Sequence, residues 1–298
     1  MAPTGLSVLI PVHNRAVGDL INSLLAQVAD WPGPVEILLL DDFSAAEIQR
    51  INRPLGELPG VRYRELAHNV GRAAIRNQLA AAARHEWLLL LDNDNLLPDA
   101  RFLARYAAAH HRAPVLIGGT CYPPAPPPDP ALHLRWRYGQ AREARPAVVR
   151  RAAPYGQLTI NNALIRTDVL RRFPLDERLT GYGHEDTKFG VELATAGVPV
   201  LHLDNPVLHD GLEPAALFLQ KSEQAVRNLA QVYHQDGLGA DSYLLQTALR
   251  LRRLGLAPAA RTALGALVPA LHRQLLSGSP RLQLLDALKL FWLLRELA

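Results

Sequence analysis

The sequence predicts an α/β fold, in which a mainly parallel sheet is covered by helices on both faces and is followed by a helical C-terminal region. Short apolar runs alternate with segments of helical periodicity through roughly the first 200 residues, a pattern typical of βαβ units in a three-layer sandwich. Beyond about residue 211 the strand patterns stop, and helices rich in Leu, Ala and Arg take over. We therefore expect a catalytic or binding domain over residues 1–211 and a helical extension over residues 212–298.

The predicted elements follow one another along the first part of the chain. Residues 6–12, LSVLIPV, form an apolar run typical of a buried strand, and apolar positions between residues 17 and 28 then recur at helical spacing. The 86–92 strand is preceded by a helix that carries Ile75, Leu79 and Ala82. The strand runs are 6–12, 35–40, 86–92, 115–119 and 198–203.

Three further features punctuate the chain. The proline-rich segment 123–130 cannot donate sheet hydrogen bonds, so we expect a stiff, extended surface loop there. In the C-terminal region, breaks between helices are expected near residues 255–258 and 277–280, where Gly, Ser and Pro gather.

Composition limits the classes of function. Of the 298 residues, 49% are hydrophobic and 20% are charged, which is typical of a globular protein. The formal charge of +4 is modest, and no basic run interleaved with aromatic residues suggests nucleic-acid binding. Cys121 is the only cysteine, which excludes an internal disulfide and a cysteine zinc cluster. With no signal-peptide pattern and no apolar stretch of ~20 residues, we expect a cytoplasmic protein, with contact to the cytoplasmic face of a membrane left open.

Polar and acidic residues follow the ends of three predicted strands. The first strand runs into PVHNR, the second into DDFS at residues 41–44, and the third into DNDN at residues 92–95. In an open parallel sheet, ligands bind beyond the carboxyl ends of the strands. Such a concentration of acids needs a positive partner, and a divalent metal with a nucleotide diphosphate would supply it.

The DND triplet is the sharpest element of this pattern. In an extended segment Asp92 and Asp94 project to the same side and can share one ligand, while Asn93 points away. Carboxylate oxygens suit Mg²⁺ or Mn²⁺, although the same letters also fit a solvated turn. Upstream, HNVGRAAIRN carries Arg72 and Arg76 on one helix face after a glycine, which suits a diphosphate but also fits an ordinary surface helix.

The stretch TGYGHEDTKFG, residues 180–190, places His184, Glu185 and Asp186 among three glycines at the expected start of a helix. The helix dipole favours ionised carboxylates there, while repulsion between adjacent acids raises the pKa of one of them. One acid can therefore accept a proton near neutral pH. The glycines, Gly181, Gly183 and Gly190, would let the loop approach a sugar closely, although the pattern also fits a plain helix N-terminus.

Five motifs follow one another in this order: the DDxS-like turn, the N-x-G-x-x-x-x-R-N segment, D-x-D, the Gly-flanked Glu-Asp pair and NPVLHDG (205–211). Together they make the chain resemble the family 2 glycosyltransferases of the GT-A fold. The resemblance extends from about Leu6 to Gly211. It implies a Rossmann-like GT-A sandwich and a metal-dependent, inverting transfer of a hexosyl or N-acetylhexosaminyl group from a nucleotide-sugar, a UDP-sugar above all, to a glycan or lipid-linked acceptor. Mn²⁺ or Mg²⁺ would be the cofactor.

The resemblance also assigns roles to single residues. Asp42 would bind the uracil or ribose, with Pro11 and His13 lining the same pocket. In the D-x-D match, Asp92 and Asn93 are assigned to the nucleotide-sugar and Asp94 to the metal. This sequence has Phe43 where the DDxS turn commonly has glycine, which puts the geometry of that turn in question.

The later motifs complete the assignment. Asp186 would be the catalytic base beside Glu185, with Gly183 and His184 in a loop that contacts the acceptor or the donor sugar. His209 would return to the metal or the diphosphate, although an ordinary hydrogen-bonded loop histidine is the alternative.

Two other functions stay open on the sequence: a metal-dependent nucleotidyltransferase, and a catalytically degenerate GT-A binding module. The first would need a glycine-rich, basic phosphate loop after the first strand, and PVHNRAVGD is poor in both. In the tail, the stripe from Leu282 to Leu294 must be covered by the catalytic domain, by a second copy in a homodimer, or by a membrane surface.

Overall fold

The structure is a computed structural model that describes residues 4–179, 183–239 and 242–298. The chain forms two compact units. The first comprises Met1–Cys121, Ala144–Arg178 and Phe189–Gly211, and the second comprises Tyr122–Glu143, Leu179–Lys188 and Leu212–Ala298. Of the glycines predicted to flank the Glu-Asp pair, Gly181 lies outside the described residues.

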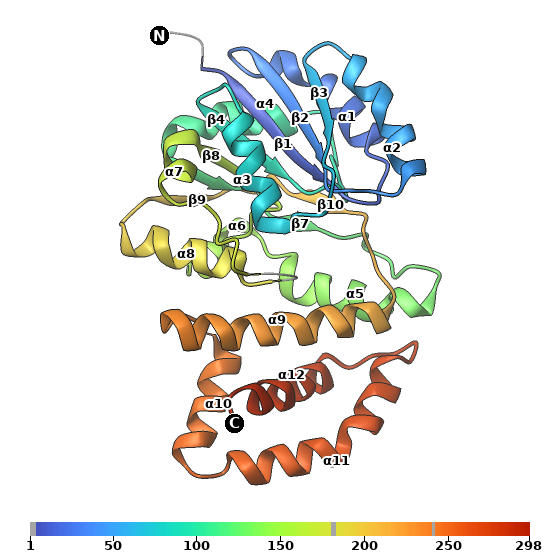
Figure 1. The fold of residues 1–298 in the computed structure, drawn as a ribbon, viewed down its shortest axis with the longest axis vertical. Coiled ribbons are helices and arrows are strands. Elements are labelled where there is room, and N and C mark those ends of the chain that lie inside the picture. Colours follow the sequence, from blue (N-terminus) through green and yellow to red (C-terminus); the bar gives the residue numbers. More distant parts are fainter. Residues whose placement is uncertain (1–3, 180–182, 240–241) are drawn as a thin grey trace. The chain divides into compact units, whose positions relative to one another are not determined.

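A seven-stranded sheet organises the first unit (Figure 1). Most neighbouring pairs are parallel, and β8 alone runs antiparallel to both of its neighbours, β4 and β6. This confirms the predicted fold class. In sheet order the strands are β3 (Val61–Glu65), β2 (Val35–Asp41), β1 (Leu6–Val12), β4 (Trp87–Leu91), β8 (Asn162–Arg166), β6 (Val115–Ile117) and β9 (Val200–His202).

The strand order reverses at β1. The chain passes from β1 to β2 and β3 on one side, and then returns to β4 on the other side of β1. Ligands of open α/β sheets bind at such a reversal, beyond the carboxyl ends of the strands. Those ends are the places where the sequence puts PVHNR, DDFS and DNDN.

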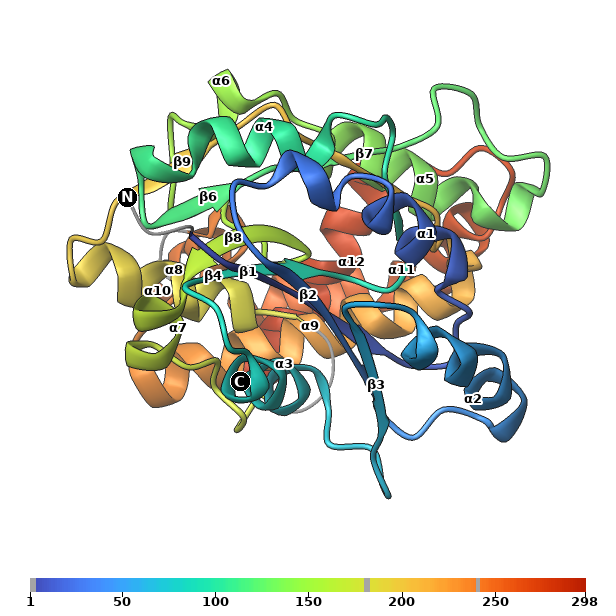
Figure 2. The same ribbon diagram turned by 90° about the horizontal axis from the view of Figure 1, so that it is seen from above.

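Apolar side chains on the two faces of the sheet form separate cores, because successive residues of a strand point to opposite faces. One core joins Val8 and Ile10 to helices α1 and α4, and the other joins Leu9 to helices α3, α7 and α8. Figure 2 shows α1 and α4 on one face of the sheet and α3 and α7 on the other. The helices of this unit are α1 (Gly18–Leu25), α2 (Ala46–Asn52), α3 (Arg72–Ala82), α4 (Phe102–Ala109), α6 (Ala147–Arg150), α7 (Thr167–Arg172) and most of α8 (Glu185–Thr195).

The first unit also contains a small second sheet, whose strand β5 follows the end of β4 in the chain. It has the order β5 (Asn95–Leu96), β10 (Val207–His209) and β7 (Thr120–Cys121). In the β5–β10 pair His209 lies opposite Asn95, the residue after the D-x-D triplet. Two motifs that are more than 100 residues apart in the sequence therefore become neighbours.

The second unit is helical. Its helices are α5 (His133–Tyr138), α9 (Ala215–Asp236), α10 (Tyr243–Arg253), α11 (Ala257–Leu275) and α12 (Leu282–Glu296). The chain breaks between α10, α11 and α12 fall at residues 254–256 and 276–281, close to the predicted breaks. Leu134 of α5 shares an apolar core with Phe218 of α9 and Trp292 of α12. None of the described helices is both long and apolar enough to cross a membrane.

Candidate active site

The end of β2 carries two aspartates with different surroundings. Asp41 is fully buried and accepts hydrogen bonds from the backbone of Ser44 (2.7 Å) and the hydroxyl of Tyr63 (3.1 Å), so it stabilises the turn. Asp42, the predicted nucleotide ligand, accepts from the backbone N–H groups of Val70 (2.7 Å) and Gly71 (3.2 Å). Each carboxylate oxygen of Asp42 keeps further lone pairs, so it can also accept from a ligand.

The loop that binds Asp42 requires its glycine. Gly71 has φ +86°, in the region that favours glycine, and it precedes the first turn of α3. The loop brings two backbone donors to Asp42 and starts the helix that carries Arg72 and Arg76. The N-x-G segment therefore links Asp42, at the end of β2, to Arg72 and Arg76, which contact Asp92 at the end of β4.

His13 follows the end of β1 and contacts the backbone of Asp42. Its Nδ1 lies 2.9 Å from the carbonyl oxygen of Asp42, and its Nε2 lies 3.0 Å from Nδ2 of Asn14. Because a carbonyl only accepts, Nδ1 carries the proton, and Nε2 accepts from the Asn14 amide. His13 is exposed and Pro11 is half-buried, which leaves both accessible to a ligand.

Phe43 explains the unusual DDFS turn. It has φ +62°, a conformation in which glycine is far more common, and 56% of its surface is exposed. The turn therefore has a conformation that glycine adopts readily, despite the large side chain of Phe43. Strain of this kind is typical of functional sites.

Asp92 is held by the two arginines of α3. Arg76, only 3% exposed, donates a hydrogen bond to Oδ1 of Asp92, and a guanidinium nitrogen of Arg72 lies 3.5 Å from Oδ2. Burial by itself would raise the pKa of Asp92, but the charges of Arg76 and Arg72 outweigh it and lower the pKa below its ordinary value. Asp92 is therefore ionised at neutral pH, and Arg76 is committed to it.

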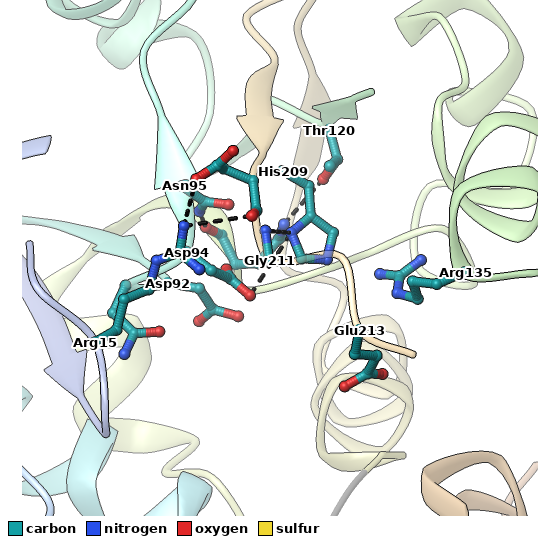
Figure 3. Close-up of polar contacts among 12 residues, drawn as sticks. Arg15, Asp92, Asp94, Asn95, Thr120, Arg135, His209, Gly211 and Glu213 are labelled. Carbon is teal, nitrogen blue, oxygen red and sulfur yellow. Dashed lines mark hydrogen bonds and ion pairs between the residues drawn. The ribbon is translucent and has the colours of Figure 1, made fainter. Parts of the chain in front are cut away.

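Asp94 faces His209 rather than the arginines. Its Oδ2 lies 3.6 Å from Nδ1 of His209, and the two side chains retain exposed fractions of 31% and 12% (Figure 3). Nδ1 also accepts a hydrogen bond from the backbone N–H of Gly211 (3.1 Å). A Cβ at Gly211 would lie 2.3 Å from Oδ2 of Asp94, so only glycine lets the HDG segment pass this close.

An asparagine network, which the motif pattern did not reveal, positions the D-x-D segment. The side chain of Asn93 donates to the carbonyl of His13 (3.2 Å), and the side chain of Asn95 donates to the carbonyl of Asn161 (2.7 Å). Asn161 in turn donates to the hydroxyl of Thr120 (2.9 Å). The Asn93 side chain thus ties the end of β4 to the end of β1. The adjacent asparagines of TINNAL were the only available sequence signal.

A second feature that sequence reasoning missed is an ion pair between Arg15 and Asp210. Arg15 follows the PVHN turn, and Asp210 lies next to His209. Both side chains are partly exposed. The pair places a cation and an anion beside the residues predicted to handle metal and diphosphate.

The predicted base belongs to the second unit, in the segment Leu179–Lys188. Glu185 and Asp186 occupy the first turn of α8, as expected, and Glu185 is 6% exposed. The carbonyl of Gly183 accepts from Asn228 of α9 (3.1 Å). Gly183 has φ +97°, and a Cβ there would lie 2.9 Å from the Cβ of Ala225.

His184 has φ +73° and lies 3.2 Å from the hydroxyl of Thr187 through Nδ1. Burial lowers its pKa to about 4, and the charge of Lys289 acts in the same direction while Glu185 opposes it. His184 is therefore neutral at pH 7, and it cannot serve there as a cationic ligand for phosphate.

His184 lines a cavity of about 720 Å³ in the second unit. Its wall combines apolar side chains with hydroxyl-bearing and charged ones, so it could contact both apolar and polar parts of a ligand. An ion pair between Arg142 and Asp286 (2.8 Å) lies at the wall, and the ammonium of Lys289 lies over the ring of Tyr138, 4.5 Å from its centroid. Other lining residues are Ser222, Val226, Leu229, Ser242, Leu244, Thr247 and Leu290.

In the first unit, the pair Asp94 and His209 is the candidate site for a divalent cation. Among the described residues, no group of three or more His, Cys, Asp or Glu side chains could hold a metal ion. Asp94 provides one carboxylate ligand, and His209 would provide a second through Nδ1 once a cation replaces the hydrogen bond from Gly211, while Asp92 is committed to Arg76. Mg²⁺ commonly binds through one or two protein ligands, with water and substrate phosphates completing its shell, so this pair suits a metal that arrives with a diphosphate.

Comparison with known proteins identifies the family of the chain. Residues 7–168 match the model of the family described as glycosyl transferase family 2. The chain is 29% identical over 228 residues to validoxylamine A glucosyltransferase of Streptomyces hygroscopicus subsp. limoneus, covering 65% of this chain and 49% of that protein. The chain thus spans about half the length of this curated relative.

Solved structures show the same fold. The mannosyltransferase PcManGT from Pyrobaculum calidifontis, in complex with GDP-Man and Mn²⁺, superposes with a TM-score of 0.57 at 18% identity, covering 89% of this chain and 75% of that one. TarS 1–349 of S. aureus, in complex with UDP, superposes with a TM-score of 0.51 at 18% identity, covering 75% and 65%. Since the family model matches more than half of the sequence, this chain belongs to glycosyl transferase family 2.

Proposed function

We propose that the chain transfers a sugar from a nucleotide-sugar, with a UDP-sugar as the first candidate, to an acceptor hydroxyl by direct displacement with inversion. The observation that carries this proposal is the convergence of Asp42, Asp92 and the Asp94–His209 pair beyond the ends of β2 and β4, next to the strand-order reversal at β1. A nucleotide diphosphate with a metal matches this set of groups. Structural neighbours solved with UDP and with GDP-Man and Mn²⁺ support the donor class.

On the donor side, Asp42 and His13 bind the base and ribose, and Asp92, oriented by Arg76, accepts from a ribose hydroxyl. Arg72, 40% exposed, extends toward the diphosphate. Asp94 and His209 would hold the cation, and when bound it supplies Lewis-acid stabilisation of the leaving diphosphate. We also propose the boundary near residue 211 as the end of the catalytic segment of the chain.

On the acceptor side, Asp186 acts as the general base. The acceptor oxygen forms a bond to the anomeric carbon, the bond from that carbon to the diphosphate oxygen breaks, and the acceptor proton passes to the Asp186 carboxylate. The first turn of α8 stabilises the ionised carboxylate, which keeps it ready to accept. The 720 Å³ cavity begins at His184, two residues before this base, and we assign it to the part of the acceptor that does not react.

A screen of nucleotide ligands tests the donor assignment. The full-length protein is titrated by calorimetry with UDP, GDP, UDP-glucose, UDP-GlcNAc and GDP-mannose, each with and without Mn²⁺. We expect one nucleotide to bind at least about tenfold more tightly with Mn²⁺, a difference of about 1.4 kcal/mol. Release of the nucleoside diphosphate in the presence of an acceptor then shows transfer. Metal-independent binding of every nucleotide would reject the metal assignment, and binding without any transfer would favour the degenerate binding module.

A further inference from the structure

The segment from Ser242 to Leu285 has charges of one sign only. It contains six arginines and neither lysine, aspartate nor glutamate. The arginines are Arg250, Arg252, Arg253, Arg261, Arg273 and Arg281. The formal charge of the whole chain is only +4, so the positive charge of these six arginines exceeds the net charge of the chain, and acidic residues elsewhere offset it. A surface of one sign is suited to a partner of the opposite sign.

These arginines differ from the other surface charges of the second unit. Elsewhere in that unit Arg142 pairs with Asp286, and Arg227 and Arg295 both pair with Glu223. Among the described residues, none of the six arginines forms an ion pair with an acidic side chain. All six are exposed. Their charge is therefore available to a partner.

Large apolar side chains are exposed among the same arginines. Leu254 (61%), Leu256 (50%), Leu267 (52%) and Leu276 (48%) all face solvent. These four exposed leucines lie between residues 254 and 276, and exposed apolar side chains that gather on a surface are unfavourable in water and usually mark an interaction site. We call Leu254, Leu256, Leu267, Leu276 and the six arginines the α10–α11 surface.

The packing of α11 explains why this surface stays open. One narrow stripe, with Leu264, Val268, Leu271 and Leu275, faces its neighbours, and α11 packs mainly on α12. Figure 1 shows α12 between α9 and α11, so α11 is an outer helix of its unit. The exposed residues of α11 are Pro258, Ala259, Arg261, Thr262, Ala263, Ala266, Leu267, Pro269, Ala270 and Arg273. The solvent-facing side of α11 is thus apolar with arginine as its only charged residue.

We propose that the α10–α11 surface binds the anionic face of a lipid membrane, with the leucines at the acyl boundary and the arginines at the lipid headgroups. An interfacial helix combines an apolar face with arginine or lysine and little acid, and it lies along the bilayer instead of crossing it. No described helix is both long and apolar enough to cross, which fits this arrangement. This interaction goes beyond the proposed sugar transfer and does not depend on it.

A second copy of the chain fits this surface less well. In a two-fold dimer the same patch meets itself, so arginines of one copy would face arginines of the other. With no acid between residues 242 and 285, the patch has no counter-charge to relieve that repulsion. Anionic lipid headgroups supply the missing charge.

Vesicle co-sedimentation of the full-length protein tests the proposal. We expect pelleting with vesicles that contain roughly 30 mol% phosphatidylglycerol, little pelleting with pure phosphatidylcholine, and release as NaCl rises from about 0.1 to 0.5 M. Arg252→Glu/Arg253→Glu should lower the partition coefficient about tenfold or more, because each arginine near an anionic surface contributes about 1 kcal/mol. Leu254→Gln/Leu267→Gln should also lower it, since the apolar faces no longer enter the acyl boundary.

Matched controls separate the patch from general charge and apolarity. Arg50→Glu/Arg112→Glu changes two exposed arginines of the first unit, and Leu217→Gln changes an exposed leucine of α9. Both should bind like the wild type. The proposal is wrong if the wild type does not pellet with anionic vesicles, or if control and patch variants lose binding equally. It is also overturned if light scattering shows a doubled mass that Leu254→Gln/Leu267→Gln abolishes, because the occupant is then a second copy.

Discussion

At the scale of single residues, the two aspartates of the D-x-D triplet have separate roles because they have separate neighbours. Asp92 is drawn to Arg76 and Arg72, which lower its pKa, whereas Asp94 faces His209. Alternation along an extended segment suggested one shared ligand for both aspartates. The structure instead separates them, through contacts with α3 on one side and β10 on the other.

Asp94→Ala should therefore abolish the metal-dependent part of nucleotide binding and leave the fold intact, since it removes a ligand at a partly exposed position. Calorimetry with the preferred nucleotide, with and without Mn²⁺, measures this loss. Asp30→Ala, a change of an exposed acid at the start of the chain, is the matched control. Unchanged Mn²⁺-dependent affinity in Asp94→Ala would remove Asp94 from the metal site.

Asp186→Asn should keep donor affinity and slow transfer by about two orders of magnitude or more, because a general base acts after the donor is bound. The measurements are donor affinity by calorimetry and the rate of nucleoside diphosphate release. A variant with near-normal transfer would move the role to Glu185 or His184. A parallel loss of donor affinity would make Asp186 a donor ligand instead.

His184 should make stability depend on pH in a defined window. Its folded pKa is about 4, below the ordinary value of 6.5, so between these values the unfolded chain binds more protons than the folded one. The stability that His184 contributes is thus complete above pH 6.5 and declines as the pH falls toward 4. Relative to His184→Asn, the wild type should lose roughly 2 kcal/mol between pH 7 and pH 5, measured by urea unfolding. A constant difference between the two proteins across that range would contradict the burial of a neutral imidazole.

At the scale of elements, the sequence predicted best where one local pattern decides. The 6–12 strand is β1, and the helix with Ile75 and Leu79 is α3, because continuous burial and helical spacing are both visible in a short window. The edge strand β3, VRYRE, was missed because it alternates with charged residues, and β8 was missed because its apolar run is short. The β5–β10 pairing, which joins Asn95 to His209, depends on contacts far apart in the sequence.

The same limit applies to the helices of the second unit. The sequence predicted their existence and their breaks, but not that α9, α10 and α12 enclose a cavity, because no local pattern encodes a void. Its lining comes from five separate segments of the chain. The acceptor assignment therefore depends on the structure.

Filling this cavity should weaken acceptor binding specifically. Thr247→Phe adds a ring at the wall, so the KM for the acceptor should rise about tenfold, as expected for the loss of a few buried contacts, while donor affinity stays the same. The control is Thr195→Phe, because both threonines donate to the carbonyl four residues earlier and Thr195 is exposed on α8. An unchanged KM in a folded Thr247→Phe protein would place the acceptor elsewhere.

At the scale of the whole molecule, the helical extension belongs to a unit that also recruits earlier segments. Tyr122–Glu143 and Leu179–Lys188 are grouped with Leu212–Ala298. The proline-rich loop at 123–130 and the predicted base therefore belong to the helical unit although they precede residue 211 in the sequence. The last segment of the chain is thus expected to be needed for the fold of its own unit.

Buried side chains of the segment Tyr122–Glu143 depend on contacts with the helical extension. Arg135 is 4% exposed, pairs with Glu143 at 3.1 Å, and lies 5.3 Å and 5.4 Å from the ring centroids of Tyr122 and Phe218. Phe218 belongs to α9, which a chain ending at Gly211 lacks. Without α9, a buried arginine and the apolar side chains beside it would be exposed to water.

A chain that ends at Gly211 should therefore be poorly soluble and unfold without a cooperative transition. Leu134 and Tyr138 lose α9 as a partner, and each buried apolar side chain contributes roughly 1.5–3 kcal/mol. Thermal unfolding followed by circular dichroism and binding of a hydrophobic dye would detect the change. Adding Leu134→Gln and Tyr138→Gln to the shortened chain should restore part of its solubility, because these residues form the newly exposed surface. A soluble shortened chain that unfolds cooperatively and binds the donor nucleotide would show that the extension is not needed to cover this face, and the α10–α11 surface would then be its main contribution.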